Sequence, residues 1–335
     1  MTRPFITIAL AALAAFALVG CGNSGEATPK EGGTGTTATK KSGEQIRLAF
    51  VTNNSSDFWT FARKGTEKAE KEMPDVKVEF KIPDDASAAG QKRIVEDLIA
   101  TGIDGVAISP NDPTNMAGDL DKWSESTLVV TQDSDAPTSK RALYVGTDNI
   151  AAGRQAGEEI KKAIPNGGKV AVFVGKIDVQ NAKERLQGIE EALKGSNCTL
   201  LPTLTDEADR VRSKANVLET LTKTPDVACL VGLWSYNGPM IINAVKEVNK
   251  QGKVKIVCFD EEPDTLQAIE DGFIDATIVQ QPYEFGYEAI KAMAAMKKGD
   301  TSGVPANKLK IIPTKVVSKA TIEEFKKTVA ELRGS

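Results

Sequence analysis

Four apolar, strand-like runs in the chain each end shortly before a side chain that can hydrogen-bond to hydroxyl groups. The polar residues are Asp133, Asn237, Asp260 and Gln280, and the runs that precede them are Thr127 to Val130, Ala228 to Leu233, Val254 to Phe259 and Ala276 to Val279. Open α/β sheets bind their ligands at the carboxyl ends of the strands. We therefore expect these carboxylates and amides to surround one crevice that binds a small polar molecule.

The composition argues against several other functions. The chain has 42 Lys plus Arg and 46 Asp plus Glu, a net charge of −4, so no nucleic-acid partner is expected. It has no histidine, and therefore lacks the commonest general base and a favoured metal ligand. Cys198, Cys229 and Cys258 show no CxxC or zinc-finger spacing, and we interpret them as small buried apolar residues, with a disulfide or redox role as the alternative. Neither a metal nor another cofactor is expected.

The acidic residues allow one enzymatic alternative. Asp133, Asp260 and Glu261 could supply an acid and base pair for glycoside cleavage. The sequence sets neither their separation nor their pKa values, and a binding site already accounts for them. We therefore expect a binding protein without catalytic residues.

The N-terminal segment has the pattern of a secretory signal. Arg3 precedes an almost continuous apolar stretch, Ile6 to Val19, which closes with Leu18-Val19-Gly20-Cys21. The stretch is too short to span a bilayer comfortably, so it predicts a signal peptide over residues 1–20. Its last four residues resemble the bacterial lipobox, which implies cleavage before Cys21 and acylation of that cysteine. Several acyl chains, each contributing roughly 0.8 kcal/mol per buried CH₂, would anchor the protein to a membrane.

The next segment predicts a lipidated, flexible tether over residues 21–45. Gly22 to Ser42 contain almost no large apolar residue and many Gly, Thr, Lys, Ser and Glu. Such a composition cannot bury enough surface to offset chain entropy. The predicted location is extracytoplasmic, in the periplasm or at the cell surface.

Beyond the tether, strand-like and helical patterns alternate over about 290 residues, which is large for one core. Ile46 to Val51 is typical of a strand, and the apolar residues from Phe58 to Met73 keep helical spacing. The cycle restarts with a helical pattern from Ala152 to Ile164 and strands at Lys169 to Val174 and Thr199 to Leu204. The pattern predicts an α/β fold of two Rossmann-like lobes with parallel-rich central sheets.

The chain is predicted to cross between the lobes several times. It returns to the first lobe near Gln280 to Pro282, and its last crossing falls within Ile311 to Val317. The predicted first lobe comprises residues 46–148 and 282–312, and the second comprises residues 149–281 and 313–335. Repeated crossing makes a multi-strand hinge, which permits closure and limits its direction.

Six segments carry a family resemblance, in order and with plausible spacing. They are Asn53 to Trp59, Asp133 to Pro137, Tyr144 to Asn149, Arg185 to Gly188, Gly232 to Asn237, and Phe259-Asp260. Together they resemble the ribose-type periplasmic sugar-binding proteins of bacterial ABC importers, from Ile46 to about Val317. The resemblance implies the type I periplasmic binding protein fold.

The resemblance also implies a set of ligand contacts. Phe58 and Trp59 match the aromatic pair that stacks on the sugar ring, with Trp234 as a further stacking candidate. Asp133 and Asp260 match carboxylates that accept hydrogen bonds from adjacent hydroxyls. The other implied contacts are the guanidinium of Arg185 and the amides of Asn237 and Gln280.

Structural alternatives remain at several of these positions. Phe58 or Trp59 could pack inward in the first helix, and Asp133 could be a turn or cap residue. Asp260 could serve a helix N-terminus, and Arg185 could pair with Glu184 at the surface.

Two departures from the ribose pattern put ribose itself in doubt as the ligand. Ser134 stands where the pattern has an arginine, and Glu207 to Arg210 stand where it has an aromatic before an Asp-Arg pair. Another pentose, a hexose, a polyol or a modified sugar is therefore compatible.

The function that the resemblance implies is capture of a monosaccharide or related polyol between the lobes and delivery to an ABC permease. The expected protein is a monomer held at the membrane by its lipid anchor. The alternative is a sensory protein that presents the sugar to a membrane receptor.

Overall fold

The computed structural model describes residues 44–334. The predicted signal peptide, the lipidated Cys21 and most of the predicted tether lie outside the described residues. Within residues 44–334, no helix combines the length and the apolar character that a membrane span requires.

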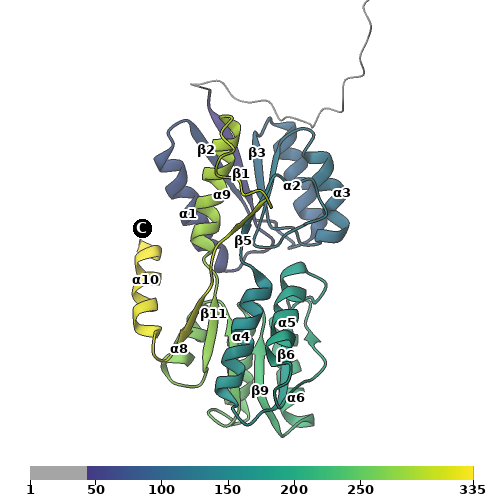
Figure 1. Ribbon diagram of the computed structural model, residues 1–335, viewed down its shortest axis with the longest axis vertical. Helices are drawn as coiled ribbons and strands as arrows, with labels where there is room; N and C mark the ends of the chain where they lie inside the picture. Colours follow the sequence, from purple (N-terminus) through teal and green to yellow (C-terminus); the bar gives the residue numbers. More distant parts are fainter. Residues whose placement is uncertain (1–43, 335) are drawn as a thin grey trace, which may run out of the picture. The chain divides into compact units, whose positions relative to one another are not determined.

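The first sheet has six parallel strands in the order β12-β5-β4-β3-β1-β2. They are β1 (Ile46–Val51), β2 (Val76–Lys81), β3 (Gly105–Ile108), β4 (Leu128–Gln132), β5 (Leu143–Gly146) and β12 (Leu309–Ile311). The helices on this sheet are α1 (Phe58–Glu72), α2 (Ala88–Ala100), α3 (Pro113–Trp123) and α9 (Pro282–Lys297). This sheet and its helices are called the first lobe (Figure 1).

Successive apolar side chains of β1 point to opposite faces of the sheet, so they pack into the core of the first lobe on both faces. Leu48 and Phe50 belong to the cluster formed with α1 and α9. Ala49 and Val51 belong to the cluster formed with α2 and α3. Because both faces are covered, the inner strands β3, β4 and β5 are mainly apolar, whereas the edge strand β2 carries Lys77 and Glu79 between its apolar residues.

The second sheet has the order β13-β11-β10-β9-β6-β7, with β8 also paired to β6. Its strands are β6 (Gly168–Val174), β7 (Cys198–Leu200), β8 (Leu204–Thr205), β9 (Val227–Gly232), β10 (Lys255–Phe259), β11 (Ala276–Val279) and β13 (Lys315–Ser318). Its helices are α4 (Asn149–Ala163), α5 (Gln180–Leu193), α6 (Arg210–Lys223), α7 (Asn237–Glu247), α8 (Pro263–Glu270) and α10 (Ile322–Gly334). All pairings are parallel except that of β11 with β13. This sheet and its helices are called the second lobe.

The expectation of a single strand over Thr199 to Leu204 is wrong. β7 ends at Leu200, and β8 begins only at Leu204, although both pair with β6. Pro202 lies in the interruption. Proline has no backbone N–H to donate to a ladder, so it divides the strand that the apolar pattern predicts.

The chain passes between the two sheets after β5, after β11 and between β12 and β13. Figure 1 shows β11 and β5 near the junction of the lobes. This topology confirms the predicted fold of two α/β lobes joined by several segments.

Candidate ligand-binding cleft

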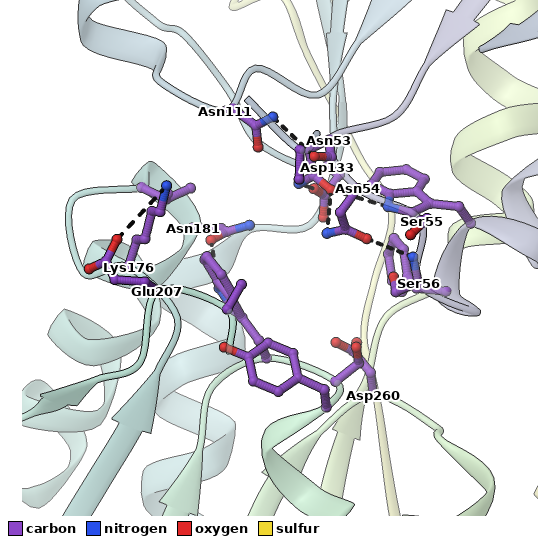
Figure 2. A pocket seen from close by; sticks show the side chains of 18 of the residues that line it. Asn53, Asn54, Ser55, Ser56, Asn111, Asp133, Lys176, Asn181, Glu207 and Asp260 are labelled. Atoms are coloured by element: carbon purple, nitrogen blue, oxygen red, sulfur yellow. Dashed lines mark hydrogen bonds and ion pairs between the residues drawn. The ribbon is translucent and has the colours of Figure 1, made fainter. Parts of the chain in front are cut away.

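A cavity of about 500 Å³ lies where the carboxyl ends of strands from both sheets meet. Residues that follow β1, β2, β3 and β4 line it from the first lobe, and residues that follow β6, β8, β9, β10 and β11 line it from the second. Figure 2 shows Asp133 and the segment from Asn53 to Ser56 across the cavity from Asn181 and Asp260. The expected crevice at the strand ends is therefore present.

Most of the predicted site residues lie in this lining. They are Phe58, Trp59, Asp133, Arg185, Trp234, Asp260 and Gln280. Asn237 is the exception and is considered below. The ligand contacts predicted for these residues stay predictions, but the structure brings the seven side chains together.

Asp133 and Asp260 occupy equivalent places in the two lobes. Asp133 follows β4 and Asp260 follows β10, each the third strand from the same end of its sheet. Both have left-handed backbone, with φ of 59° and 67°. Aspartate adopts this region more readily than most residues. The strained turns are held by similar bonds, because Tyr144 Oη donates to the Asp133 carbonyl at 3.0 Å and Thr277 Oγ1 donates to the Asp260 carbonyl at 2.8 Å.

The two carboxylates are buried, and each accepts a side-chain hydrogen bond from a neighbouring polar residue. Ser109 Oγ donates to Asp133 Oδ2 at 2.7 Å, and Gln280 Nε2 donates to Asp260 Oδ1 at 3.0 Å. Burial raises the pKa of Asp133 to about 6, against the opposing effects of Ser109 and Arg185. Burial likewise raises the pKa of Asp260 above its usual range. Charged acceptors in a dry site bind hydroxyl donors strongly.

Arg185 is the cation that stabilises both carboxylates. Its side chain is only 1% exposed, so the alternative of a surface pair with Glu184 is wrong. Nε donates to Asn149 Oδ1 at 3.0 Å, Nη1 donates to the Leu233 carbonyl at 2.7 Å, and the guanidinium lies 4.5 Å from the centre of the Phe259 ring. Nη2 is buried without a hydrogen-bond partner among the described residues. A buried guanidinium donor is costly to leave unpaired, so this nitrogen is available to a ligand.

The aromatic pair in the first lobe is more deeply packed than a simple stacking platform. Phe58 and Trp59 both line the cavity, but only 8% of Phe58 and 2% of Trp59 are exposed. Their rings meet edge to face at 4.9 Å, and Phe58 also lies 6.3 Å from Phe285. Trp59 Nε1 donates to Asn53 Oδ1 at 3.1 Å, which fixes the side chain of a second lining residue.

The prediction of a direct ligand contact by Asn237 is not supported, because its amide lies outside the cavity lining. The side chain is fully buried, and Oδ1 accepts from the Trp234 backbone N–H at 2.9 Å. Nδ2 donates to Asp206 and Ser213 at 3.3 and 3.2 Å. Asn237 thus holds the loop that presents Trp234 and Tyr236, and Trp234 itself lines the cavity.

Several lining residues were not predicted. They are Asn53, Asn54, Ser55, Ser56, Asp85, Ala86, Asn111, Lys176, Val179, Asn181, Glu207, Ala208, Arg210, Ser235 and Tyr236. Most follow the carboxyl end of a strand, so the rule that selected Asp133 would have found them if applied to β1, β3, β6 and β8. Glu207 and Arg210, noted in the sequence as departures from the ribose pattern, lie at the cavity. They form ion pairs with Lys176 at 3.9 Å and Glu262 at 3.0 Å.

Comparison with known proteins agrees with this geometry. The sequence pattern of the periplasmic binding protein domain matches residues 48–301. The ribose import binding protein of Escherichia coli is 27% identical over 209 residues, which cover 62% of this chain and 70% of that protein. The solved solute binding protein of Burkholderia graminis in complex with D-arabinose is 30% identical, with a TM-score of 0.80, and covers 84% of this chain and 98% of its own.

A solved complex named XylFII-LytSN contains a further neighbour, which is 29% identical with a TM-score of 0.76 and covers 82% of this chain and 98% of its own. The family match extends over more than half of the chain, and it confirms the resemblance that the sequence motifs indicate. The chain therefore belongs to the periplasmic binding protein family, among its ribose-type sugar-binding members.

Proposed function

We propose that this chain is an extracytoplasmic binding lipoprotein that captures a monosaccharide or related polyol and delivers it to an ABC permease. The observation that carries the proposal is the set of unsatisfied polar atoms around one cavity. Arg185 Nη2 is a buried donor and Gln280 Oε1 a buried acceptor, each without a partner among the described residues. Aromatic rings and two buried carboxylates lie beside them.

This mixture of groups suits a neutral sugar. A sugar has little apolar area and many hydroxyls, so tight binding requires every desolvated hydroxyl to be paired. Hydrogen bonds to charged groups contribute roughly 1.5–3 kcal/mol each. A handful of them would support a micromolar complex, near about −8 kcal/mol, after the costs of association. An analogue that lacks one hydroxyl leaves a buried charge unpaired, which gives specificity.

The two lobes give the proposal its mechanism. We assign residues 46–148 and 282–312 to one lobe and residues 149–281 and 313–335 to the other, in keeping with the strand order of the two sheets. The sugar binds first to one lobe, and contacts from the other then stabilise the closed form. The chain does no chemistry on the sugar in this proposal.

A panel of monosaccharides and polyols, screened by thermal shift and then by calorimetry, tests the binding function. A ligand that binds only the folded protein raises its apparent stability, by about 2.7 kcal/mol at a hundredfold excess over Kd. Saturable binding of at least one sugar, with no hydrolysis of its glycosides, is expected. A panel in which no sugar raises the melting temperature would contradict the proposal.

The lipid anchor at Cys21 rests on the sequence, because the residue lies outside those that the structure describes. Replacement Cys21→Ser removes the acylated sulfur and is expected to move the protein from the membrane fraction to the soluble fraction. Fractionation of cells that express the two forms measures this. A Cys21→Ser protein that still sediments with membranes would refute the anchor.

A sensory role is the second candidate. The supporting observation is that one structural neighbour forms a complex with another protein, LytSN. In this alternative the sugar-bound chain presents its surface to a membrane receptor and does not deliver the sugar. Deletion of the cognate permease separates the two roles, since transport predicts loss of sugar uptake and sensing predicts loss of signalling alone.

Sugar affinity is expected to fall in acid. Bound hydroxyls donate to the ionised carboxylate, so binding lowers the pKa of Asp133 from about 6 and releases a proton. One pH unit below that pKa, roughly one free molecule in ten is ionised, and the Kd at pH 5 should be about tenfold weaker than at pH 8. Arg185 opposes protonation and Asp260 favours it, so the two acids titrate as a pair.

Calorimetry at both pH values, in buffers with different ionisation enthalpies, measures the affinity and counts the protons released. An affinity that does not change between pH 8 and pH 5 would show that neither acid must be ionised to hold the ligand.

A further inference from the structure

A buried carboxylate behind the cavity connects the parts of its second-lobe wall. Asp206 lies between β8 and α6, is 0% exposed and does not line the cavity. Its Oδ1 accepts from the Ala208 backbone N–H at 2.9 Å and from the hydroxyl of Tyr236. Its Oδ2 accepts from Asn237 Nδ2 at 3.3 Å.

The first of these bonds shapes the loop before α6. Glu207 and Ala208 both line the cavity and both have left-handed backbone, with φ of 55° and 62°. Two consecutive residues in this region are costly without glycine, roughly 1–2 kcal/mol each. The bond from the Ala208 N–H to the Asp206 side chain closes the turn and stabilises that conformation.

The other bonds reach the two aromatic residues of the wall. The hydroxyl of Tyr236 binds Asp206 directly, and Trp234 is held through Asn237. The orientation of the Asn237 amide is unambiguous, because the Trp234 N–H must meet an acceptor and the Asp206 carboxylate must meet a donor. The rings of Trp234 and Tyr236 lie edge to face, 6.4 Å apart.

Asp206 has no ion-pair partner among the described residues. The nearby cations are engaged elsewhere, Lys176 with Glu207 and Arg210 with Glu262. Burial raises the pKa of Asp206, which means that the folded protein holds this negative charge at a cost in free energy. A carboxylate only accepts hydrogen bonds, and this one receives donors from several sides, which a neutral amide of the same shape cannot do.

We propose that Asp206 is the positioning residue for the second-lobe wall of the cavity, fixing Glu207, Ala208, Trp234 and Tyr236 in the arrangement that meets the sugar. The inference deepens the proposed sugar-binding function and rests on it. Asp206 acts through its neighbours and does not itself contact the ligand.

Gly175 is a second, steric determinant of the same wall. A Cβ at this position would lie 2.1 Å from Cζ3 of Trp234 and 2.8 Å from the hydroxyl of Tyr236. Its φ is not in the left-handed region, so alanine is compatible with the backbone. Gly175→Ala is therefore expected to displace both rings and weaken sugar binding, independently of any charge.

The variant Asp206→Asn tests the proposal. It keeps the size of the side chain but places an amide NH₂ against Asn237 Nδ2, so two donors face each other. Asn237 must then turn and release the Trp234 backbone. We expect sugar affinity to fall at least tenfold. The reciprocal double variant Asp206→Asn/Asn237→Asp restores a donor opposite an acceptor and is expected to recover most of the affinity.

A spectroscopic measurement without ligand separates this inference from the sugar-binding function. The chain has 3 tryptophans, so 5-fluorotryptophan labelling gives three ¹⁹F signals, of which Trp234→Phe identifies one. Asp206→Asn should shift or broaden the Trp234 signal and leave that of Trp123, in the core of the first lobe, unchanged. The double variant should return the Trp234 signal towards its original position.

Asp275→Asn is the matched control. It removes a carboxylate that accepts the Ile256 N–H at 3.0 Å at the opposite end of the same sheet, and neither affinity nor the Trp234 signal should change. An unchanged Trp234 signal in Asp206→Asn, or a shift of all three signals, would overturn the positioning role. If Asp206→Asn does not fold, Tyr236→Phe removes a single bond to the carboxylate and is expected to move the same signal. If the wild-type protein binds no sugar but Asp206→Asn still moves the Trp234 signal, the positioning role is supported and the proposed sugar-binding function is refuted.

Discussion

Replacement of Arg185 by methionine is expected to weaken sugar binding at least a hundredfold, or about 3 kcal/mol. The unpartnered Nη2 would no longer be present to bind a hydroxyl. Asp133 and Asp260 would also lose the positive charge that lowers the pKa of both, so each would take up a proton more readily and become a weaker acceptor. The expected loss of sugar affinity in Arg185→Met therefore comes from more than one contact.

Arg154→Met is the matched control for Arg185→Met. Arg154 lies on α4 and forms an ion pair with Glu191 of α5 at 2.7 Å, but its side chain is 53% exposed. An exposed pair of this kind contributes little, typically below about 1 kcal/mol, so sugar affinity should be unchanged. Urea unfolding of both variants establishes that they are folded, since Arg185→Met also loses the bonds to Asn149 and Leu233. Affinity close to wild type in Arg185→Met would show that the ligand does not reach this part of the cavity.

Open α/β sheets bind their ligands at the carboxyl ends of the strands, and this rule explains why so much of the site could be predicted from the sequence. A continuous apolar run predicts a buried strand, and the polar residues that follow it lie at the edge of the sheet, which is where Asp133 and Asp260 line the cavity. The rule gives position along a strand but not side-chain direction. Asn237 follows β9 as predicted, yet its amide turns inward, and the three residues before it, Trp234 to Tyr236, line the cavity.

Other features depend on contacts between segments that are distant in sequence. No local sequence pattern predicts the role of Asp206, because that role depends on contacts among the residues after β8, the start of α6 and the loop before α7. Pro202 is a local signal for the interrupted strand, because its missing N–H outweighs the apolar pattern around it. The left-handed backbone at Asp133 and Asp260 likewise follows from the sharp turns that bring both carboxylates to the cavity.

Asp260→Asn is expected to weaken sugar binding roughly a hundredfold while leaving the unliganded protein as stable as wild type or more stable. Asparagine keeps the size of the side chain and tolerates the φ of 67°. It also removes a charge whose pKa is raised by burial, and therefore an unfavourable term in the folded protein. The sugar loses a charged acceptor for its hydroxyls, at a cost of about 2–3 kcal/mol.

Asp260→Ala should bind more weakly still and be less stable than Asp260→Asn. Alanine has no acceptor for Gln280 Nε2 and is strained at this backbone conformation by roughly 1–2 kcal/mol. Calorimetry gives the affinities and chemical denaturation without sugar gives the free energies of unfolding. Asp264→Asn, an exposed substitution in the first turn of α8, is the matched control: affinity should not change, and loss of the charge beside the helix N-terminus should lower the free energy of unfolding by no more than about 0.3–1 kcal/mol.

Opposite effects of Asp260→Asn on affinity and stability distinguish a ligand-binding carboxylate from a structural one. A structural acid is retained because it stabilises the fold, so its removal lowers the free energy of unfolding with or without sugar. An acid kept for binding is buried at a cost, which the bound hydroxyls offset. Near-normal affinity in Asp260→Asn, or a parallel loss of stability and affinity, would therefore show that Asp260 does not bind the ligand. Asp133 and Arg185 would then be the charged residues that do.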